Sequence, residues 1–168
     1  MIFASVGSML PFDRLVRAVD DWAAANPSQE VFLQIGRGEY EPRHAPFARM
    51  MPHDEYRRRL ERCQLFVAHV GMGSILQSLE AGKQLLMLPR LARLREHTTD
   101  HQLHTAARFR DVAGLMSVDS AEALQASMTR LLREPLSTSA GISKLAQPVM
   151  LERVADYLIG RSRGLMDA

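Results

Sequence analysis

The sequence predicts an α/β fold with a Rossmann-like, mostly parallel sheet and helices on both of its faces. Three observations lead to this prediction. Short apolar runs typical of buried strands alternate with segments whose apolar residues recur at helical spacing. The stretch 65–82 has the pattern of a strand, a glycine turn and a helix. A length of 168 residues, 46% of them hydrophobic and 24% charged, suits a single domain spanning residues 1–168.

The strands are predicted from apolar runs that end at glycine, proline or polar residues. These runs cover residues 1–6, 31–35, 47–51, 65–68, 84–88 and 114–118, of which 47–51 is the weakest. The helices are predicted to begin near residues 11, 52, 74, 100, 119 and 148. Pro11 and Pro148 suit a first helical turn, and Asp119 with Glu122 forms a capping box. The last helix belongs to a C-terminal helical segment at about 137–160.

Charge and hydropathy limit the functional classes. The 21 basic residues are interspersed with 19 acidic ones, so we expect no nucleic-acid partner. The one basic cluster, at residues 57–59, has acidic neighbours and predicts a solvated helix face. No apolar run approaches the roughly 20 residues that span a bilayer, and the first residues do not resemble a signal peptide. We therefore expect a cytoplasmic protein, with Cys63 as a buried thiol.

Four loops that follow predicted strands should meet at one edge of the sheet, where ligands of such folds bind. They lie at residues 7–8, 36–38, 69–74 and 89–102. Gly71 and Gly73 allow a tight turn into a helix, whose first N–H groups would bind an anion, phosphate above all. From these residues alone, a purely structural turn is about as plausible as a phosphate site. Ser74 could likewise be a helix cap and nothing more.

Taken together, the motifs in these loops carry a family resemblance. They are Val6-Gly7-Ser8, Gln34-Ile35-Gly36, the stretch from His69 to Ile75, Gly82-Lys83, Pro89-Arg90, Glu96-His97 and Asp100-His101-Gln102. Over roughly residues 1–118 the sequence resembles the C-terminal, donor-binding half of family 28 glycosyltransferases, in the sub-group where that half is a separate chain. It is similar to bacterial exopolysaccharide glycosyltransferase subunits and to the catalytic subunit of the two-chain UDP-N-acetylglucosamine transferase of N-glycan assembly. The resemblance implies the C-terminal half of a GT-B fold.

The resemblance also implies a nucleotide-sugar site with three parts. The diphosphate would be held at Gly7, Ser8, Gly71, Met72, Gly73 and Ser74. The ribose and base would be bordered by Gln77, Glu80, Met51 and His53. The donor sugar would contact Arg90, Arg95, Glu96, His97, Asp100, His101 and Gln102. Helix N–H groups would stabilise the departing UDP, so neither a metal ion nor another cofactor is implied.

Two positions depart from the family pattern. Gln77 stands where the family usually has a glutamate that accepts hydrogen bonds from the ribose, and an uncharged acceptor makes a bond roughly half as strong. Arg95 stands where relatives generally have glycine. Together with Arg90 and Arg93 it makes the loop cationic, and one hypothesis is that one of these arginines meets the carboxylate of an acidic donor sugar. The alternative is that Arg95 faces solvent or a partner subunit.

The histidines leave two further alternatives open. Residues 96–104 contain three imidazoles and two carboxylates, and the four-residue spacing of His97 and His101 could hold zinc on a helix, as in a zinc-dependent hydrolase. His69, beside the glycine turn, is either a structural residue or one that orients the phosphate loop. It is also the one candidate for a catalytic group in this chain, although we expect the catalytic base on the acceptor side.

The preferred hypothesis is the donor-binding, catalytic subunit of a two-component inverting glycosyltransferase. It would move a sugar from a UDP-sugar to a lipid-linked acceptor in surface or exopolysaccharide synthesis. A membrane-anchored partner subunit would bind the acceptor and bring the chain to the inner face of the membrane. The alternative is a non-catalytic module of the same fold that assembles a membrane complex, in which case Gln77 would mark a weakened nucleotide site.

Overall fold

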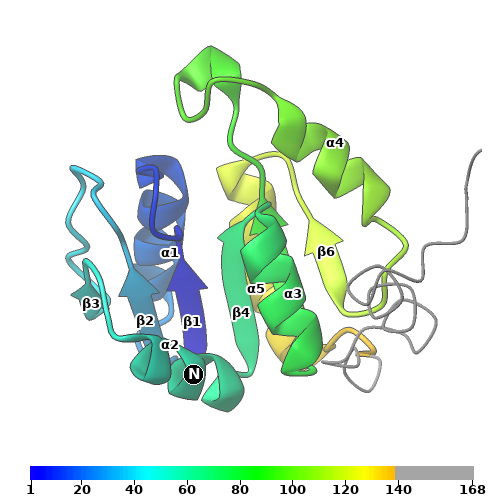
Figure 1. Ribbon diagram of the computed structural model, residues 1–168. Helices are drawn as coiled ribbons and strands as arrows, with labels where there is room; N and C mark the ends of the chain where they lie inside the picture. The colour runs from blue at the N-terminus through cyan, green and yellow to red at the C-terminus, as the bar shows by residue number, and fades with distance from the viewer. Residues whose placement is uncertain (139–168) are drawn as a thin grey trace, which may run out of the picture.

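The structure, a computed structural model, describes residues 1–138 and contains one six-stranded sheet in that region (Figure 1). The strands are β1 (Ile2–Ser5), β2 (Val31–Gln34), β3 (Phe47–Ala48), β4 (Leu65–His69), β5 (Leu85–Leu88) and β6 (Leu115–Ser117). All five pairings between neighbouring strands are parallel, in the order β3-β2-β1-β4-β5-β6. The expected α/β fold with a mostly parallel sheet is confirmed.

The helices follow the strands as expected, with small differences at their ends. They are α1 (Asp13–Ala25), α2 (His53–Arg62), α3 (Met72–Glu80), α4 (His101–Arg108) and α5 (Ala121–Arg133). A short 3-10 helix, η1 (Ala92–Leu94), lies in the loop after β5, where no helix was predicted. The predicted helix beginning near residue 148 lies outside the described residues.

The predicted cap of α5 is wrong by one residue. Ser120, not Asp119, is the N-cap, and its hydroxyl accepts a hydrogen bond from Ala123 N at 3.1 Å. The backbone of Ser120 is extended, which places its short side chain over the first turn of the helix. Adjacent serine and aspartate are both good caps, so sequence alone cannot choose between them.

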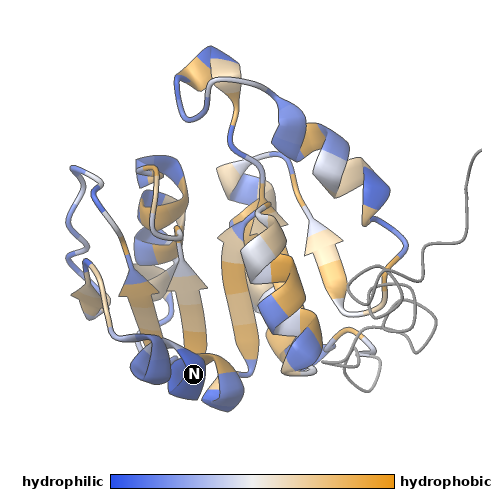
Figure 2. Cartoon of the chain, in the orientation of Figure 1, coloured by the Kyte–Doolittle hydropathy of each residue, from blue (hydrophilic) through white to orange (hydrophobic). Residues whose placement is uncertain are grey.

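Helices cover both faces of the sheet, and a hydrophobic core fills each interface. On one face α1 and α5 pack on the strands, with Trp22 and Met128 among the buried residues. On the other face α2 and α3 pack against a core that includes Phe3 and Phe66, whose rings stack at 5.6 Å. The strands between these layers are largely hydrophobic along their length (Figure 2). Burial on both faces explains why the strands appear in the sequence as continuous apolar runs.

The strand order places a topological switch point between β1 and β4. β2 and β3 lie beyond β1 on one side of this central pair, and β5 and β6 lie beyond β4 on the other side. The loops that leave the carboxyl ends of β1 and β4 therefore diverge and leave a crevice between them. The first and third of the four predicted loops lie at this point.

Two further expectations about the surface and the core are confirmed. Arg57 and Arg58 each pair with an acidic residue four positions away on the exposed side of α2. Arg59 pairs with Glu55 in the same way but is half-buried, with its guanidinium over the ring of Phe32. Cys63 is buried, and burial raises the pKa of its thiol to about 11. In the described part of the chain, no helix has the length and apolar character needed to cross a membrane.

Candidate functional site

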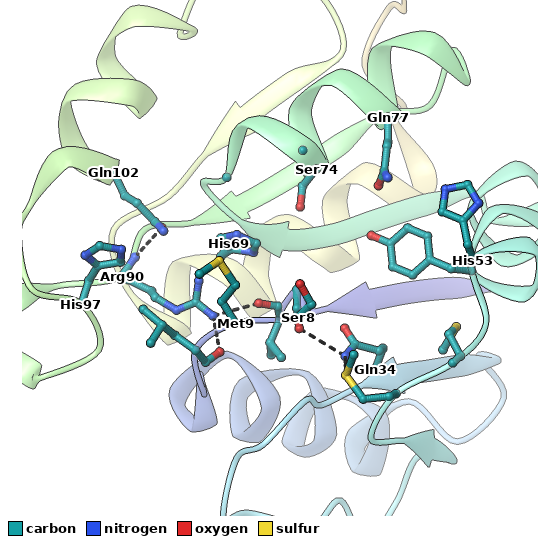
Figure 3. A pocket seen from close by; sticks show the side chains of 18 of the residues that line it. Ser8, Met9, Gln34, His53, His69, Ser74, Gln77, Arg90, His97 and Gln102 are labelled. Atoms are coloured by element: carbon teal, nitrogen blue, oxygen red, sulfur yellow. Dashed lines mark hydrogen bonds between the residues drawn. The ribbon is translucent and has the colours of Figure 1, made fainter.

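A cavity of about 580 Å³ opens beyond the carboxyl ends of β1 and β4, at the switch point (Figure 3). Its lining contains one arginine, four histidines and, among the described residues, no aspartate or glutamate. Such a lining favours an anionic ligand. The lining residues are Val6, Gly7, Ser8, Met9, Leu10, Gln34, Met50, Met51, His53, Tyr56, His69, Gly71, Gly73, Ser74, Gln77, Arg90, His97, His101 and Gln102.

The N-terminus of α3 faces this cavity. Gly71 is the N-cap residue, with an extended backbone, and no side chain in the described region caps the helix. Ser74 is the third residue of the helix, so the alternative that it is the cap is wrong. Its side chain is largely buried at the cavity wall, and its hydroxyl has no hydrogen-bond partner within residues 1–138. The first turn of α3 thus presents unpaired donors to the cavity, as an anion site requires.

Gly71 and Gly73 serve different purposes. A Cβ atom on Gly71 would overlap the imidazole of His69, so packing within the protein excludes a side chain there. A Cβ atom on Gly73 would have no described atom within 4 Å, and its φ is not in the left-handed region. Neither packing nor backbone conformation therefore requires glycine at position 73. Close approach of a ligand to the backbone would require it.

His69 lies between the two glycine loops. A Cβ on Gly7 would come within 2.8 Å of its Cε1 atom, and Gly7 also has a φ of +79°. The Nδ1 atom of His69 is buried and has no partner in the described part of the chain. Burial, and then the charges of Arg90 and His97, lower the pKa of His69 to about 3. The imidazole is therefore neutral at physiological pH and separates the two loops as an uncharged spacer.

Gln34 fixes the loop after β1, a role that the sequence did not reveal. Its Oε1 accepts a 2.7 Å hydrogen bond from the hydroxyl of Ser5, which also accepts one from Gly7 N. Its Nε2 donates to the carbonyl oxygens of Gly7 and Arg49 at 3.2 and 2.8 Å. One buried amide thus joins the ends of β1, β2 and β3. In the sequence, a glutamine at the end of a predicted buried strand was the sign that could have indicated this role.

Arg90 and Gln102 line the cavity but are bonded mainly to the protein itself. Nη2 of Arg90 donates to the carbonyl oxygens of Val6 and Leu10 at 2.8 and 2.7 Å. Oε1 of Gln102 accepts from Arg90 N at 3.0 Å. Burial lowers the pKa of Arg90 to about 10, which leaves the guanidinium charged at neutral pH. Arg90 therefore contributes positive charge to the cavity while it holds the first loop.

Three predicted sugar contacts lie outside the cavity lining. Both oxygens of Glu96 accept hydrogen bonds from Arg14 at 2.8 Å. Asp100, at the start of α4, accepts from Ala92 N. Arg95 is exposed and has a φ of 57°, a left-handed conformation that glycine adopts more easily. In the structure, Glu96 and Asp100 hydrogen-bond within the protein and Arg95 is exposed, and contacts of these three residues with a sugar remain predictions.

Two other predicted site residues also lie outside the main lining. Met72 is in the first turn of α3, and its side chain is exposed. Glu80 lines a neighbouring cavity of about 180 Å³ between α2 and α3, which shares His53, Tyr56 and Gln77 with the main one. Tyr56 has no counterpart among the predictions, because a tyrosine on a polar helix gives no signal of a site.

The histidine cluster does not form a metal site in the described residues. His97 and His101 stack edge to face at 4.4 Å, and burial, His101 and Arg90 together lower the pKa of His97. Within residues 1–138, no three His, Cys, Asp or Glu side chains are arranged to hold a metal ion. Glu96 and Asp100, the carboxylates of the zinc alternative, hydrogen-bond within the protein. The zinc-hydrolase alternative therefore lacks a ligand set.

Comparison of the sequence with protein families gives one match. Residues 1–154 match the model described as the glycosyltransferase family 28 C-terminal domain. No match was found among curated proteins.

Three solved structures with a similar fold are glycosyltransferases. The glycotransferase of kitacinnamycin superimposes with a TM-score of 0.62 at 23% identity, over 80% of this chain and 35% of that one. The spinosyn forosaminyltransferase SpnP gives 0.53 at 19% identity, over 79% and 35%. SnogD from Streptomyces nogalater gives 0.53 at 17% identity, over 96% and 43%. The fold is that of the C-terminal half of GT-B glycosyltransferases, and the chain spans well under half the length of these structures.

Proposed function

The chain belongs to glycosyltransferase family 28, and from this and the site we propose that it is the donor-binding, catalytic component of a two-component inverting glycosyltransferase. The donor in this proposal is a UDP-sugar, and the acceptor is lipid-linked, in the synthesis of a surface polysaccharide or exopolysaccharide. The family supports the donor-binding role. The nucleotide, the acceptor and the second component are parts of the proposal.

The observation that carries the proposal is the uncapped N-terminus of α3 at the wall of a cavity whose described lining contains no carboxylate. Backbone N–H groups of the first turn, the hydroxyl of Ser74 and the open space at Gly73 together suit a diphosphate. The charge of Arg90 adds to the field of the helix dipole. Both would stabilise the negative charge that develops on a departing nucleoside diphosphate.

The order of the lining residues along the cavity supports a nucleotide sugar as the ligand. In Figure 3, Gln77 and His53 lie at one end, Ser74 and Ser8 in the middle, and His97 with Gln102 at the other end. We place the base and ribose at the first end, the diphosphate at the centre and the sugar at the last. Polar side chains at the sugar end would orient its hydroxyls.

The transfer step would proceed by direct displacement. The acceptor oxygen forms a bond to the anomeric carbon while the bond from that carbon to the β-phosphate oxygen breaks, and the electron pair leaves with UDP. The acceptor proton passes to a base. His69 is a poor candidate, because a pKa of about 3 makes it too weak to take a proton near neutral pH. We therefore assign the base to the acceptor side.

The need for a second component has its own support. Met9 and Met50, at the cavity lining, are 83% and 56% exposed. Apolar side chains around a ligand cavity suit coverage by another protein surface. In the proposal this surface belongs to the acceptor-binding subunit, which is anchored in the membrane.

The test is calorimetric titration of the chain with UDP, alone and with its partner, for the wild type and Gly73→Asp. The new carboxylate would occupy the open space where we place the diphosphate. It would not harm folding, because aspartate in a first turn interacts favourably with the helix dipole and replaces glycine. We expect Gly73→Asp to abolish UDP binding while its melting temperature stays equal or rises. Ala121→Asp, the same charge in the first turn of α5, is the matched control and should bind UDP normally.

Each result separates the hypotheses. Binding by the wild type and by Ala121→Asp, and loss of binding in Gly73→Asp, would support a nucleotide site at α3. If the wild type binds no UDP even with its partner present, the non-catalytic assembly module becomes the better explanation. If Gly73→Asp binds UDP as well as the wild type, the diphosphate does not lie at the N-terminus of α3.

A further inference from the structure

Two loops on opposite sides of β4 are tied together above its carboxyl end. The loop after β1 (residues 6–12) and the loop after β5 (residues 89–99) are separated in the sheet by β4. Arg90 reaches from the second loop to the first, and Arg14, in α1, reaches back to the second loop. We call Arg90, Arg14 and Glu96 the arginine clasp.

Arg90 provides one half of the clasp. Its Nη2 donates to the carbonyl oxygens of Val6 and Leu10, and its Nε donates to that of Pro11 at 3.4 Å. The guanidinium also lies 4.9 Å from the centre of the Phe12 ring. In Figure 3, dashed lines join Arg90 to the loop that carries Ser8 and Met9. Arg90 is only 3% exposed, and its guanidinium is enclosed by the backbone of this loop.

Arg14 and Glu96 provide the other half. Nε and Nη2 of Arg14 donate to the two carboxylate oxygens of Glu96, each at 2.8 Å, and Nη2 also donates to the carbonyl oxygen of Pro89. Glu96 accepts a further hydrogen bond from Leu91 N. The backbone on both sides of Arg90 is therefore fixed to α1. A bidentate arginine–carboxylate pair restricts orientation more than a single contact does.

The first loop has little else to hold it. Residues 8–11 are exposed, with Met9 at 83%, so hydrophobic burial cannot define their position. Gly7 is fixed at the start of the loop, because its N–H donates to Ser5 and its carbonyl oxygen accepts from Gln34. Beyond Gly7, Arg90 holds the loop through the carbonyl oxygens of Leu10 and Pro11. The position of Ser8 at the cavity wall therefore depends on Arg90.

We propose that the arginine clasp positions the Gly7–Ser8 loop against the nucleotide diphosphate, with Arg90 acting as a positioning residue through the backbone of this loop. This inference rests on the proposed nucleotide site. Gln102, at the sugar end of the cavity, accepts from Arg90 N, so the clasp also connects the sugar end to the phosphate loop. A lysine could preserve the charge at position 90. It could not reproduce the planar fork that reaches several carbonyl groups at once.

The experiment compares Arg90→Lys with Arg90→Met by UDP titration and by hydrogen exchange at the amides of residues 7–10 and 12. If Arg90 acts by position, both variants lose UDP affinity, by about tenfold or more, because charge-assisted hydrogen bonds to the loop are lost in each. Exchange at these amides should accelerate, and exchange in α3 should remain unchanged. Arg93→Lys is the control on the same loop, since Arg93 is exposed and does not line the cavity, and it should match the wild type.

Other results would overturn the inference. If Arg90→Lys keeps full affinity and only Arg90→Met loses it, Arg90 acts by its charge alone. If both bind UDP normally, the loop does not depend on the clasp. If Arg90→Lys does not fold, Arg14→Lys provides a second variant, because it weakens the contacts that join α1 to the loop after β5. Arg14→Lys should show the same faster exchange and weaker UDP binding. Failure of wild-type binding would count against the nucleotide site itself, which distinguishes the two proposals.

Discussion

The turn after β4 and the loop after β5 meet at the same cavity, but they differ in whether their polar groups have hydrogen-bond partners within the protein. In the turn, the hydroxyl of Ser74 and the first N–H groups of α3 lack side-chain partners among the described residues. In the loop, Arg90, Glu96 and Asp100 all hydrogen-bond to the chain itself. Under the proposed function, the turn contacts the diphosphate, whereas Arg90 and Glu96 hold the backbone of the neighbouring loops in place. Four sets of substitutions test this comparison.

The largest expected effect is at Glu96. The carboxylate is 11% exposed and pairs with Arg14, so Glu96→Ala leaves a mostly buried guanidinium without its partner. We expect a loss of about 3 kcal/mol in the free energy of unfolding, measured by urea denaturation. Glu61→Ala is the control, because its pair with Arg57 is exposed, and it should change stability by less than about 1 kcal/mol. Normal stability with abolished transfer would instead place Glu96 at the sugar.

The next effect distinguishes the two glycines of the turn. Gly71→Ala forces a methyl group against His69 and should cost about 2 kcal/mol of unfolding free energy, as overpacking does. Gly73→Ala meets no described atom within 4 Å and should stabilise α3 by about 0.5–1 kcal/mol. Thermal denaturation measures both. Equal destabilisation by the two changes would contradict the different purposes inferred for these glycines.

Two serines of α3 provide a matched pair. Ser74→Ala removes a hydroxyl that faces the cavity, and we expect about a tenfold loss of UDP affinity with little change in stability. Ser78→Ala removes a hydroxyl that donates to Lys83 O at 2.6 Å. This variant should lose about 1 kcal/mol of stability and bind UDP normally. Calorimetry and denaturation of both variants are the measurements, and identical behaviour of the pair would remove the functional role of Ser74.

The smallest effect concerns Arg95. Its left-handed backbone suits glycine, so Arg95→Gly should raise the free energy of unfolding by about 1 kcal/mol. Because Arg95 is exposed and outside the cavity lining, the ratio of affinities for UDP-glucose and UDP-glucuronic acid should not change. A change in this ratio would support the acidic-sugar hypothesis instead. Arg93→Gly, without a left-handed backbone, should give no such gain in stability.

The glycine turn shows how far sequence reasoning reaches in the site. Gly71, Gly73 and Ser74 were found because a local pattern of strand, turn and helix determines where their groups point. Tyr56 was missed, and Gln34 was quoted in a motif without a role at the site, because their place at the cavity depends on segments distant in sequence. Glu96 and Asp100 were expected at the sugar, whereas the structure pairs them with Arg14 and with the backbone of Ala92. Sequence shows that a polar group is present, but not which partner it finds.

The sequence by itself determined the fold class, the order of strands and helices, and the edge of the sheet where the site lies. Hydrophobic periodicity and turn residues act over a few positions, so they can be read along the chain. Only the tertiary structure decided that the turn after β4 keeps its donors free, whereas the loop after β5 is closed by the arginine clasp. The physical reason is that the hydrogen bonds of Arg14 and Arg90 join groups far apart in sequence, and their meeting depends on how the whole sheet is assembled.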